Sequence, residues 1–159
     1  MVACWLIRHQ VDLNSRDTQD RTPIHIAVQS GCHEVVRSLI DARADPTLPC
    51  KGATTLHHAT IRRDGRMVML LLGACMVKVA GGGDDGGYAT PLLEYVNCVK
   101  KDGWTALGLA ARAGDAAIAK ALVDAGANVA AVMGNGKTAL ELARLNKRSA
   151  VVSLLEASG

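Results

Sequence analysis

Residues 102–129 read DGWTALGLAARAGDAAIAKALVDAGANV, and this stretch decides the fold. Its string TALGLA begins at Thr105, and similar strings begin at Thr22 (TPIHIA), Thr54 (TTLHHA) and Thr138 (TALELA). These threonines are spaced by 32, 51 and 33 residues, so the middle spacing exceeds the others by 18. Self-similarity at a period of roughly 20–50 residues is the signature of a stacked repeat protein. The chain is therefore predicted to contain four related units.

Each unit carries the apolar pattern of two successive helices. An aliphatic residue follows each threonine by two positions, an alanine by five, and further apolar residues by 13, 14 and 17. Such spacings place the apolar side chains on one face of each helix. Gly31 and Gly114 follow their threonines by nine, where a helix ends in a left-handed residue. Arg63 and Lys147 occupy that place in the other two units, so those turns are predicted to be less regular.

This pattern resembles the ankyrin repeat, which has a period of about 33 residues and the signature T-P-L-H-x-A. The resemblance covers nearly the whole chain and is strongest over residues 21–45 and 102–129. It implies an all-α fold, an ankyrin-repeat solenoid of stacked helix-turn-helix units with β-hairpin fingers. The motifs identify no individual member of the family.

The repeat register predicts a single domain over residues 1–159. We place a half repeat at 2–15, repeats at 16–47, 48–98 and 99–131, and a C-terminal capping repeat at 132–159. The helix Cys4–Ile7 of the half repeat would expose apolar surface, so either the chain begins inside a longer protein or another surface packs there.

The 18 additional residues of the second repeat are predicted to lie at about 76–93, just after its second helix. They include GGGDDGG (81–87), which is expected to be flexible coil. TPLLEYV (90–96) is either a single helical turn or the remnant of a shortened repeat. We favour an inserted loop over a vestigial repeat.

Composition limits the classes of protein that the chain can represent. Of 159 residues 49% are hydrophobic, no Phe is present, and the net charge is only +3. A mild charge gives no argument for nucleic acid or a membrane surface as partner. Five separated cysteines without a C-x-x-C pair signal neither zinc nor a redox dithiol. The longest apolar run, 67–77, is far shorter than the roughly 20 residues that span a bilayer. We predict a cytoplasmic protein, with a nuclear location also open.

Residues 134–138 read GNGKT, which resembles the end of a phosphate-binding loop. Such a loop needs G-x-x-x-x-G-K-[ST] after a buried strand, and Ala131 stands at its first glycine. The repeat register accounts for the same letters. Gly136 aligns with the turn glycines of earlier units, and Thr138 with Glu141 forms a capping box. A hairpin tip is predicted, and nucleotide binding is kept as a remote alternative.

No other cluster predicts catalysis, a cofactor or a metal. His25 and His57 occupy the fourth position of the signature, where the resembled family uses histidine to bond the first helix and tie neighbouring repeats together. His58, adjacent to His57, points in another direction and makes a poor metal pair. Asp84 and Asp85 lie in the glycine-rich segment, which is a poor cation site. We therefore predict a non-enzymatic protein.

The resemblance implies that a partner protein binds a concave face, made of the finger tips and the exposed sides of the first helices. The register places these finger residues on it: Arg16, Thr18, Gln19, Arg21, Cys50, Lys51, Ala53, Lys101, Asp102, Trp104, Gly134, Asn135 and Lys137. From the first helices it adds Gln29, Ser30, Ile61, Arg62, Arg112, Ala113, Leu145 and Asn146.

Trp104 is the one large aromatic residue of this face, and Trp and Arg are frequent interface hot spots. We predict that Trp104, flanked by Lys101 and Arg112, anchors an acidic or amphipathic segment of a partner protein. The alternative is that its ring lies across the neighbouring hairpin. The expected function is a scaffold or regulator that is monomeric unless its N-terminal edge pairs. A second possibility is that the chain is part of a larger enzyme, channel or transcription regulator.

Overall fold

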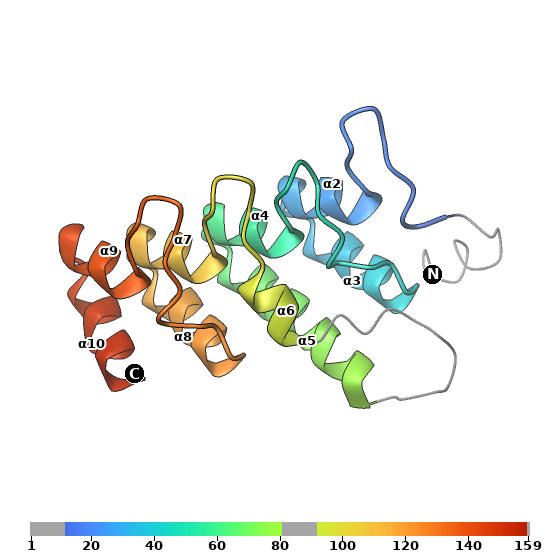
Figure 1. The fold of residues 1–159 in the computed structure, drawn as a ribbon. Coiled ribbons are helices and arrows are strands. Elements are labelled where there is room, and N and C mark those ends of the chain that lie inside the picture. Colours follow the sequence, from blue (N-terminus) through green and yellow to red (C-terminus); the bar gives the residue numbers. More distant parts are fainter. Residues whose placement is uncertain (1–11, 81–91, 159) are drawn as a thin grey trace.

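The computed structural model of the chain describes residues 12–80 and 92–158. These parts contain nine helices, α2 to α10, and no β-sheet. Four helix pairs stack into an elongated solenoid (Figure 1). The first helices of the pairs form one layer: α2 (Pro23–Ser30), α4 (Thr55–Ile61), α7 (Ala106–Ala113) and α9 (Ala139–Leu145). The second helices form the other layer: α3 (His33–Asp41), α5 (Gly65–Ala80), α8 (Ala116–Asp124) and α10 (Ser149–Ala157). The predicted all-α solenoid is confirmed.

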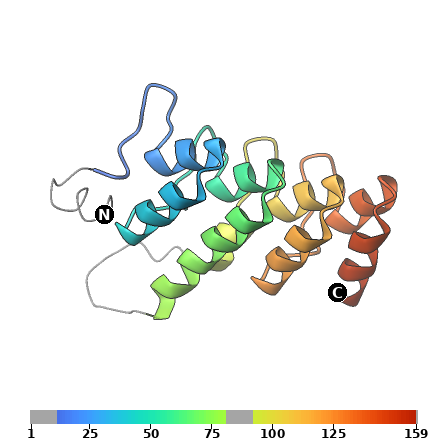
Figure 2. The same ribbon diagram turned by 180° about the vertical axis from the view of Figure 1, so that it is seen from behind.

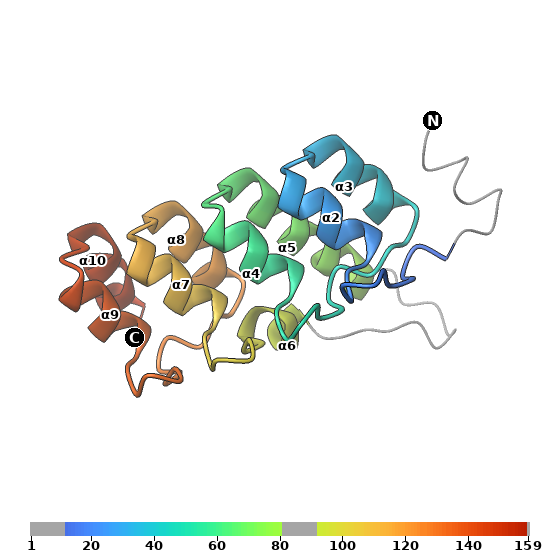
Figure 3. The ribbon, with the colours of Figure 1, turned by 90° about the horizontal axis from the view of Figure 1, so that it is seen from above.

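The order of the repeats along the chain is also their order in space. Within the first-helix layer α2 contacts α4, α4 contacts α7, and α7 contacts α9. Seen from behind, the second helices form a parallel row in front of the first (Figure 2). The loops that precede α4, α7 and α9 project from the same side of the stack (Figure 3). We call these loops, together with the one that precedes α2, the fingers.

The fingers contain less β-pairing than the expected β-hairpins. Isolated bridges join Cys50 to Ala53, Val99 to Thr105 and Val132 to Thr138, and no strand forms in the described residues. Fingers of this kind have few ladder hydrogen bonds of their own, so their shape depends on contacts with neighbouring fingers.

Each of the four repeat threonines caps the start of a first helix, as predicted. Thr22, Thr54, Thr105 and Thr138 are extended N-cap residues with φ between −83° and −88°. The Oγ1 atom of Thr105 accepts a hydrogen bond from the Gly108 amide at 3.1 Å, which satisfies one of the free N–H groups of the helix start. An N-cap of this kind is worth about 1 kcal/mol.

Each turn between paired helices contains a left-handed residue. Gly31 and Gly114 are left-handed, with φ of 73° and 80°. Arg63 and Lys147 adopt the same left-handed conformation, with φ of 57° and 55°. The Cβ atom of a non-glycine residue makes this conformation costly, by roughly 1–2 kcal/mol, because it approaches the following carbonyl oxygen. All four turns share one conformation, and the less regular turns predicted at Arg63 and Lys147 are not seen. The difference from the glycine turns is the strain of a non-glycine residue.

Lys147→Gly is expected to raise the free energy of unfolding by about 0.5–1 kcal/mol, because relief of the left-handed strain outweighs the greater freedom of glycine in the unfolded chain. Thermal unfolding followed by circular dichroism should show a Tm higher by a few degrees, about 2–4 °C per kcal/mol for a chain of this size. Gly114→Ala is the opposite control and should lower the Tm. An unchanged or lower Tm for Lys147→Gly would contradict this account of the turn.

The core is a continuous row of aliphatic and small side chains between the two layers. Ile24, Leu56 and Leu107 from successive first helices are at most 1% exposed, and Leu71 and Leu122 meet them from the second helices with no exposure. Burying one such side chain contributes roughly 1.5–3 kcal/mol. Because each repeat packs only on its neighbouring repeats, stability accumulates repeat by repeat.

The second repeat departs from its neighbours in the length of its second helix. Helix α5 has 16 residues, whereas α3 and α8 have nine each. The sequence placed the insertion at about 76–93 directly after the second helix, but residues 76–80 continue that helix. No helix-breaking residue follows Leu72 until Gly81 apart from Gly73, which explains the extension. The expected flexible coil at 81–87 and the helix expected at Cys4–Ile7 lie outside the described residues.

A short helix, α6 (Leu92–Asn97), forms at the position of TPLLEYV. The side chain of Tyr95 is 2% exposed, and its hydroxyl lies 2.6 Å from Thr55 Oγ1. Thr55 in turn donates to the carbonyl of Pro46 at 2.6 Å, so Tyr95 donates to Thr55. This buried chain of hydrogen bonds attaches α6 to the start of α4. Burial raises the pKa of the Tyr95 hydroxyl, which stays neutral and able to donate.

Candidate protein-binding face

The fingers contact one another and form a continuous row. The tip glycines Gly52, Gly103 and Gly136 have φ of 80°, 78° and 73°, as the register predicted. A Cβ atom added to Gly52 would lie 2.9 Å from Cβ of Lys101, and one added to Gly103 would lie 2.8 Å from the backbone of Gly134. The Gly134 amide donates to the Gly103 carbonyl at 3.0 Å. Contacts this close fix each finger against the next.

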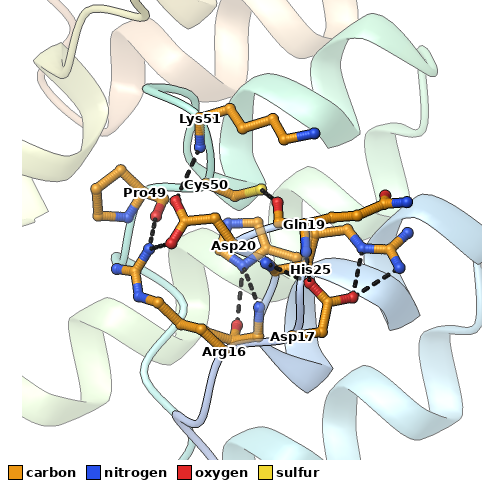
Figure 4. A network of polar contacts seen from close by, with 10 residues as sticks. Arg16, Asp17, Gln19, Asp20, His25, Pro49, Cys50 and Lys51 are labelled. Atoms are coloured by element: carbon orange, nitrogen blue, oxygen red, sulfur yellow. Dashed lines mark hydrogen bonds and ion pairs between the residues drawn. The ribbon is translucent and has the colours of Figure 1, made fainter.

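The first finger is held by two ion pairs of its own (Figure 4). Nη1 of Arg16 lies 2.6 Å from Asp20 and also donates to the Pro49 carbonyl of the second finger at 2.9 Å. Arg21 donates to Asp17 through Nε at 2.9 Å and Nη2 at 2.7 Å. The Arg21 side chain and backbone amide lower the pKa of Asp17 to about 2. Arg16 and Arg21, which the sequence predicted to contact a partner protein, are therefore already paired with carboxylates of their own finger.

The link between the first two fingers continues through the backbone and a thiol. Oδ2 of Asp20 accepts from the Lys51 amide at 3.3 Å, and Sγ of Cys50 approaches the Gln19 carbonyl at 3.8 Å (Figure 4). Burial raises the pKa of the Cys50 thiol above its ordinary value. Cys50 thus lies inside the finger row and not on its outer surface, while Thr18, Gln19 and Lys51 are exposed.

The third finger holds the predicted aromatic anchor. Cζ of Arg112 lies 4.7 Å from the centre of the Trp104 ring, within the range of a cation–π contact. Trp104 is partly buried against the core, and Arg112 is exposed on the last turn of α7. Lys100 forms an ion pair with Asp102 at 2.7 Å, which lowers the pKa of that carboxyl. Lys101 is exposed beside this pair.

The ends of the first helices supply a mixed surface. Ile61 and Leu145 are 55% and 61% exposed, so each adds an apolar side chain to this surface. Nη1 of Arg62 donates to the Gln29 carbonyl at 2.8 Å and thereby joins α4 to the end of α2. Nδ2 of Asn146, the residue that caps the end of α9, donates to the Leu142 carbonyl of that helix. Ser30 and Asn146 are exposed, and Gln29 and Ala113 are half-buried.

The GNGKT segment forms the tip of the fourth finger. Its backbone amides already donate within the protein: Gly134 to Gly103, Gly136 to Met133, Lys137 to Asn135 and Thr138 to Glu141. A phosphate-binding loop depends on free N–H groups that point at the ligand. The capping box predicted for Thr138 and Glu141 is confirmed. Asn135 and Lys137 are exposed at the finger tip.

The two signature histidines are structural. His25 and His57 are fully buried, and each forms a capping box with the threonine three residues before it. Nε2 of His57 donates to the Trp104 carbonyl at 3.1 Å, so it ties the second repeat to the third as expected. Burial is the main cause that lowers the pKa of both rings to about 4. Both are therefore neutral at pH 7.

His58 has a contact that the sequence did not suggest. Its ring packs edge-on against His25, with 6.0 Å between the ring centres, and burial lowers its pKa. Within residues 12–80 and 92–158, no three His, Cys, Asp or Glu side chains gather in a group suited to a metal. The same part of the chain contains no helix that is both long and apolar enough to cross a bilayer.

The ion pairs inside the fingers are the feature of the face that sequence reasoning missed. The signal was present, because Asp17, Asp20 and Asp102 each lie within four residues of the basic residue that they pair with. Because of these ion pairs, some basic residues of the fingers are paired with a carboxylate of the same finger, and others have no such carboxylate.

Comparison with known proteins agrees with the repeat architecture. A family model described as ankyrin repeats (3 copies) matches residues 1–81 and again residues 79–159. The two matches together cover the whole chain. A search of curated proteins finds no match.

Proposed function

Because the chain belongs to the ankyrin-repeat family, whose repeats are generally protein–protein interaction modules, we propose that it is a scaffold or regulator that binds a partner protein. The proposed binding surface is the finger face, by which we mean the finger tips and the exposed ends of α2, α4, α7 and α9. We assign the protein to the cytoplasm, with a nuclear location also open, and regard it as a monomer.

The observation that carries this proposal is the Trp104–Arg112 stack. The ring is half-buried, so its position is fixed by the core, while part of it remains accessible and Arg112 stacks on it. A fixed aromatic ring loses little conformational entropy when a partner covers it, which favours binding. Aromatic and arginine side chains in such positions are typical hot spots.

The charges around the stack favour an acidic or amphipathic segment. Arg112 and Lys101 both lie on the exposed surface near Trp104, and a carboxylate of a partner could meet either of them while an apolar side chain covers the ring. The exposed Ile61 and Leu145 extend the apolar part along the first helices. The mild net charge of +3 argues against nucleic acid or an anionic membrane as the principal partner.

The proposal is tested by affinity capture from a lysate of the source cells. Wild-type protein is compared with the variant Lys101→Glu/Trp104→Ala/Arg112→Glu, and captured proteins are identified by mass spectrometry. We expect one or more partners to be lost with the variant, because truncating a hot spot costs about 2 kcal/mol or more. Captured partners should also associate more slowly as salt is raised, because basic residues at the rim act mainly on the rate of association.

The control is the variant Arg37→Glu/Met69→Ala/Lys120→Glu, which changes the same kinds of side chain on α3, α5 and α8 of the second-helix layer. All three residues are exposed, so the fold should persist. A partner list that changes equally in both variants, or in neither, would contradict the finger face as the binding surface.

A further inference from the structure

Three successive fingers each present one exposed lysine: Lys51, Lys101 and Lys137. Among the described residues none of these three side chains forms an ion pair. The other basic residues near the finger tips are paired within their own finger: Arg16 with Asp20, Arg21 with Asp17 and Lys100 with Asp102. Arg43 is also exposed and forms no ion pair among the described residues, but it lies at the base of the second finger, just after α3. The unpaired positive charge at the finger tips is therefore concentrated in three ammonium groups, one to a finger.

These lysines stand on a backbone whose shape is already fixed. Lys51 is left-handed, with φ of 51°, and its amide donates to Asp20 of the preceding finger. Cβ of Lys101 lies against the site where Gly52 lacks a side chain. The finger of Lys137 is joined to the preceding finger by the Gly134 to Gly103 hydrogen bond. A ligand that bridges the fingers would therefore order lysine side chains only, and not the loops that carry them.

The stacking of the repeats sets the distance between the charges. Packed helices lie roughly 8–10 Å apart, so successive fingers are separated by a similar distance. An extended polypeptide advances about 3.3 Å per residue. It therefore passes one finger about every three residues, and the long lysine stems accommodate differences of position within each finger.

Resting on the proposed function above, we propose that the finger row binds an extended acidic segment of the partner in which a carboxylate recurs about every third residue. Lys51, Lys101 and Lys137 each meet one of these carboxylates. The segment crosses the fingers along the length of the stack and reaches the Trp104–Arg112 surface at the third finger.

The arrangement of charges favours a polypeptide over a nucleic acid strand. Asp20 lies against the backbone of Lys51, and Asp102, 57% exposed, follows Lys101 directly. A nucleic acid strand carries a phosphate at every nucleotide, one for about every 3.4 Å of helix axis in a stacked strand, and would bring phosphates near these carboxylates. An acidic polypeptide can place neutral residues there. Single-strand binding also relies on several aromatic platforms, whereas Trp104 is the only Trp, Tyr or Phe in the fingers.

The test is a titration followed by NMR, using the ¹⁵N-labelled protein at low salt. The probe is the peptide (Glu-Gly-Ser)₃, compared with a peptide of equal composition whose three glutamates are contiguous, and with oligothymidylate. The tip glycines Gly52, Gly103 and Gly136 report binding through their amide shifts. The test variant is Lys51→Gln/Lys101→Gln/Lys137→Gln. Its control, Arg37→Gln/Arg66→Gln/Lys120→Gln, removes the same charge from exposed sites on the second helices.

We expect the spaced peptide to shift all three glycine amides and to bind the finger variant about tenfold more weakly, since each exposed ion pair contributes about two- to threefold. The control variant should bind within about twofold of wild type. Binding of the contiguous peptide that is equal or tighter overturns the inference, as does equal weakening in the two variants. Tighter binding of oligothymidylate at the same glycines overturns it in favour of nucleic acid.

Failure of this inference is distinguishable from failure of the proposed function. A cellular partner whose capture depends on Trp104, together with no response to the spaced peptide, overturns the lysine assignment alone. Loss of the Trp104 dependence itself overturns the proposed function.

Discussion

Lowering the pH from 7.5 to 5 is expected to reduce the free energy of unfolding by about 4 kcal/mol, through two buried histidines. Burial lowers the pKa of His25 and His57 to about 4, whereas a histidine in the unfolded chain titrates near 6.5. Between these values the unfolded state binds more protons, so stability falls as the pH falls, by about 2 kcal/mol for each ring at pH 5. The loss begins near pH 6.5 and is complete below about pH 4.

The charges near His25 and His57 also lower the pKa values of these rings overall. His58 and Arg16 lower the pKa of His25, which Asp20 opposes, and Lys100 lowers that of His57. The measurement is urea unfolding followed by circular dichroism at several pH values from 7.5 to 5. Since proteins of this size have total stabilities of about 5–15 kcal/mol, the predicted loss is a large fraction of the whole.

The matched variant is His25→Gln/His57→Gln. Glutamine retains a capping-box side chain at the third helical position but does not titrate. The variant is expected to be less stable at pH 7.5 and to lose most of the pH dependence, keeping the part that comes from His58, whose pKa burial also lowers. The two single substitutions should each remove a similar share of the dependence. A double variant that keeps the full wild-type dependence would show that other groups cause it.

Gly103→Ala is expected to destabilise the protein by about 2–4 kcal/mol, far more than alanine at an ordinary exposed turn. The residue has φ of 78°, which costs alanine about 1 kcal/mol, and its added Cβ would lie 2.8 Å from both N and Cα of Gly134. The obstruction is backbone, so it cannot be relieved by turning a side chain. The adjacent fingers must separate, and the Gly134 to Gly103 hydrogen bond is strained or lost. Urea unfolding of the variant measures this loss.

Gly136→Ala provides the control. Its φ of 73° is nearly the same, but no atom lies within 4 Å of an added Cβ. This variant should lose only the conformational part, about 1 kcal/mol. The difference between the two variants therefore measures the contact between the third and fourth fingers. Equal losses in both would show that this contact contributes little to stability.

The sequence predicted those features that depend on local chemistry. A threonine before an apolar helix caps that helix in any context, and a glycine nine residues later ends it. For this reason Thr105 and Gly114 were placed correctly from the sequence alone. The signature of His57 likewise predicted its role, because the histidine bonds a threonine only three residues away.

Features that depend on packing between distant segments were not predictable in the same way. The stacking of Arg112 on Trp104 is one of several conformations open to a long side chain, and the core decides among them. The buried bond between Tyr95 and Thr55 joins residues 40 apart. Such outcomes are set by the assembled structure and carry little trace in local sequence.

The segment between α5 and α6, which interrupts the second repeat, has a consequence for how such a repeat protein can evolve. The cost of closing a connection between two packed elements grows only with the logarithm of its length, by about 0.6 kcal/mol for each doubling, so a longer connection costs little. The bonds of Tyr95 to Thr55 and of His57 to Trp104 hold the two sides together regardless of the length between them. Helix α5, which belongs to the second-helix layer, is the last element before this segment, so insertions and deletions after it would leave the first-helix layer in register. Selection can therefore vary this segment while the rest of the solenoid is preserved.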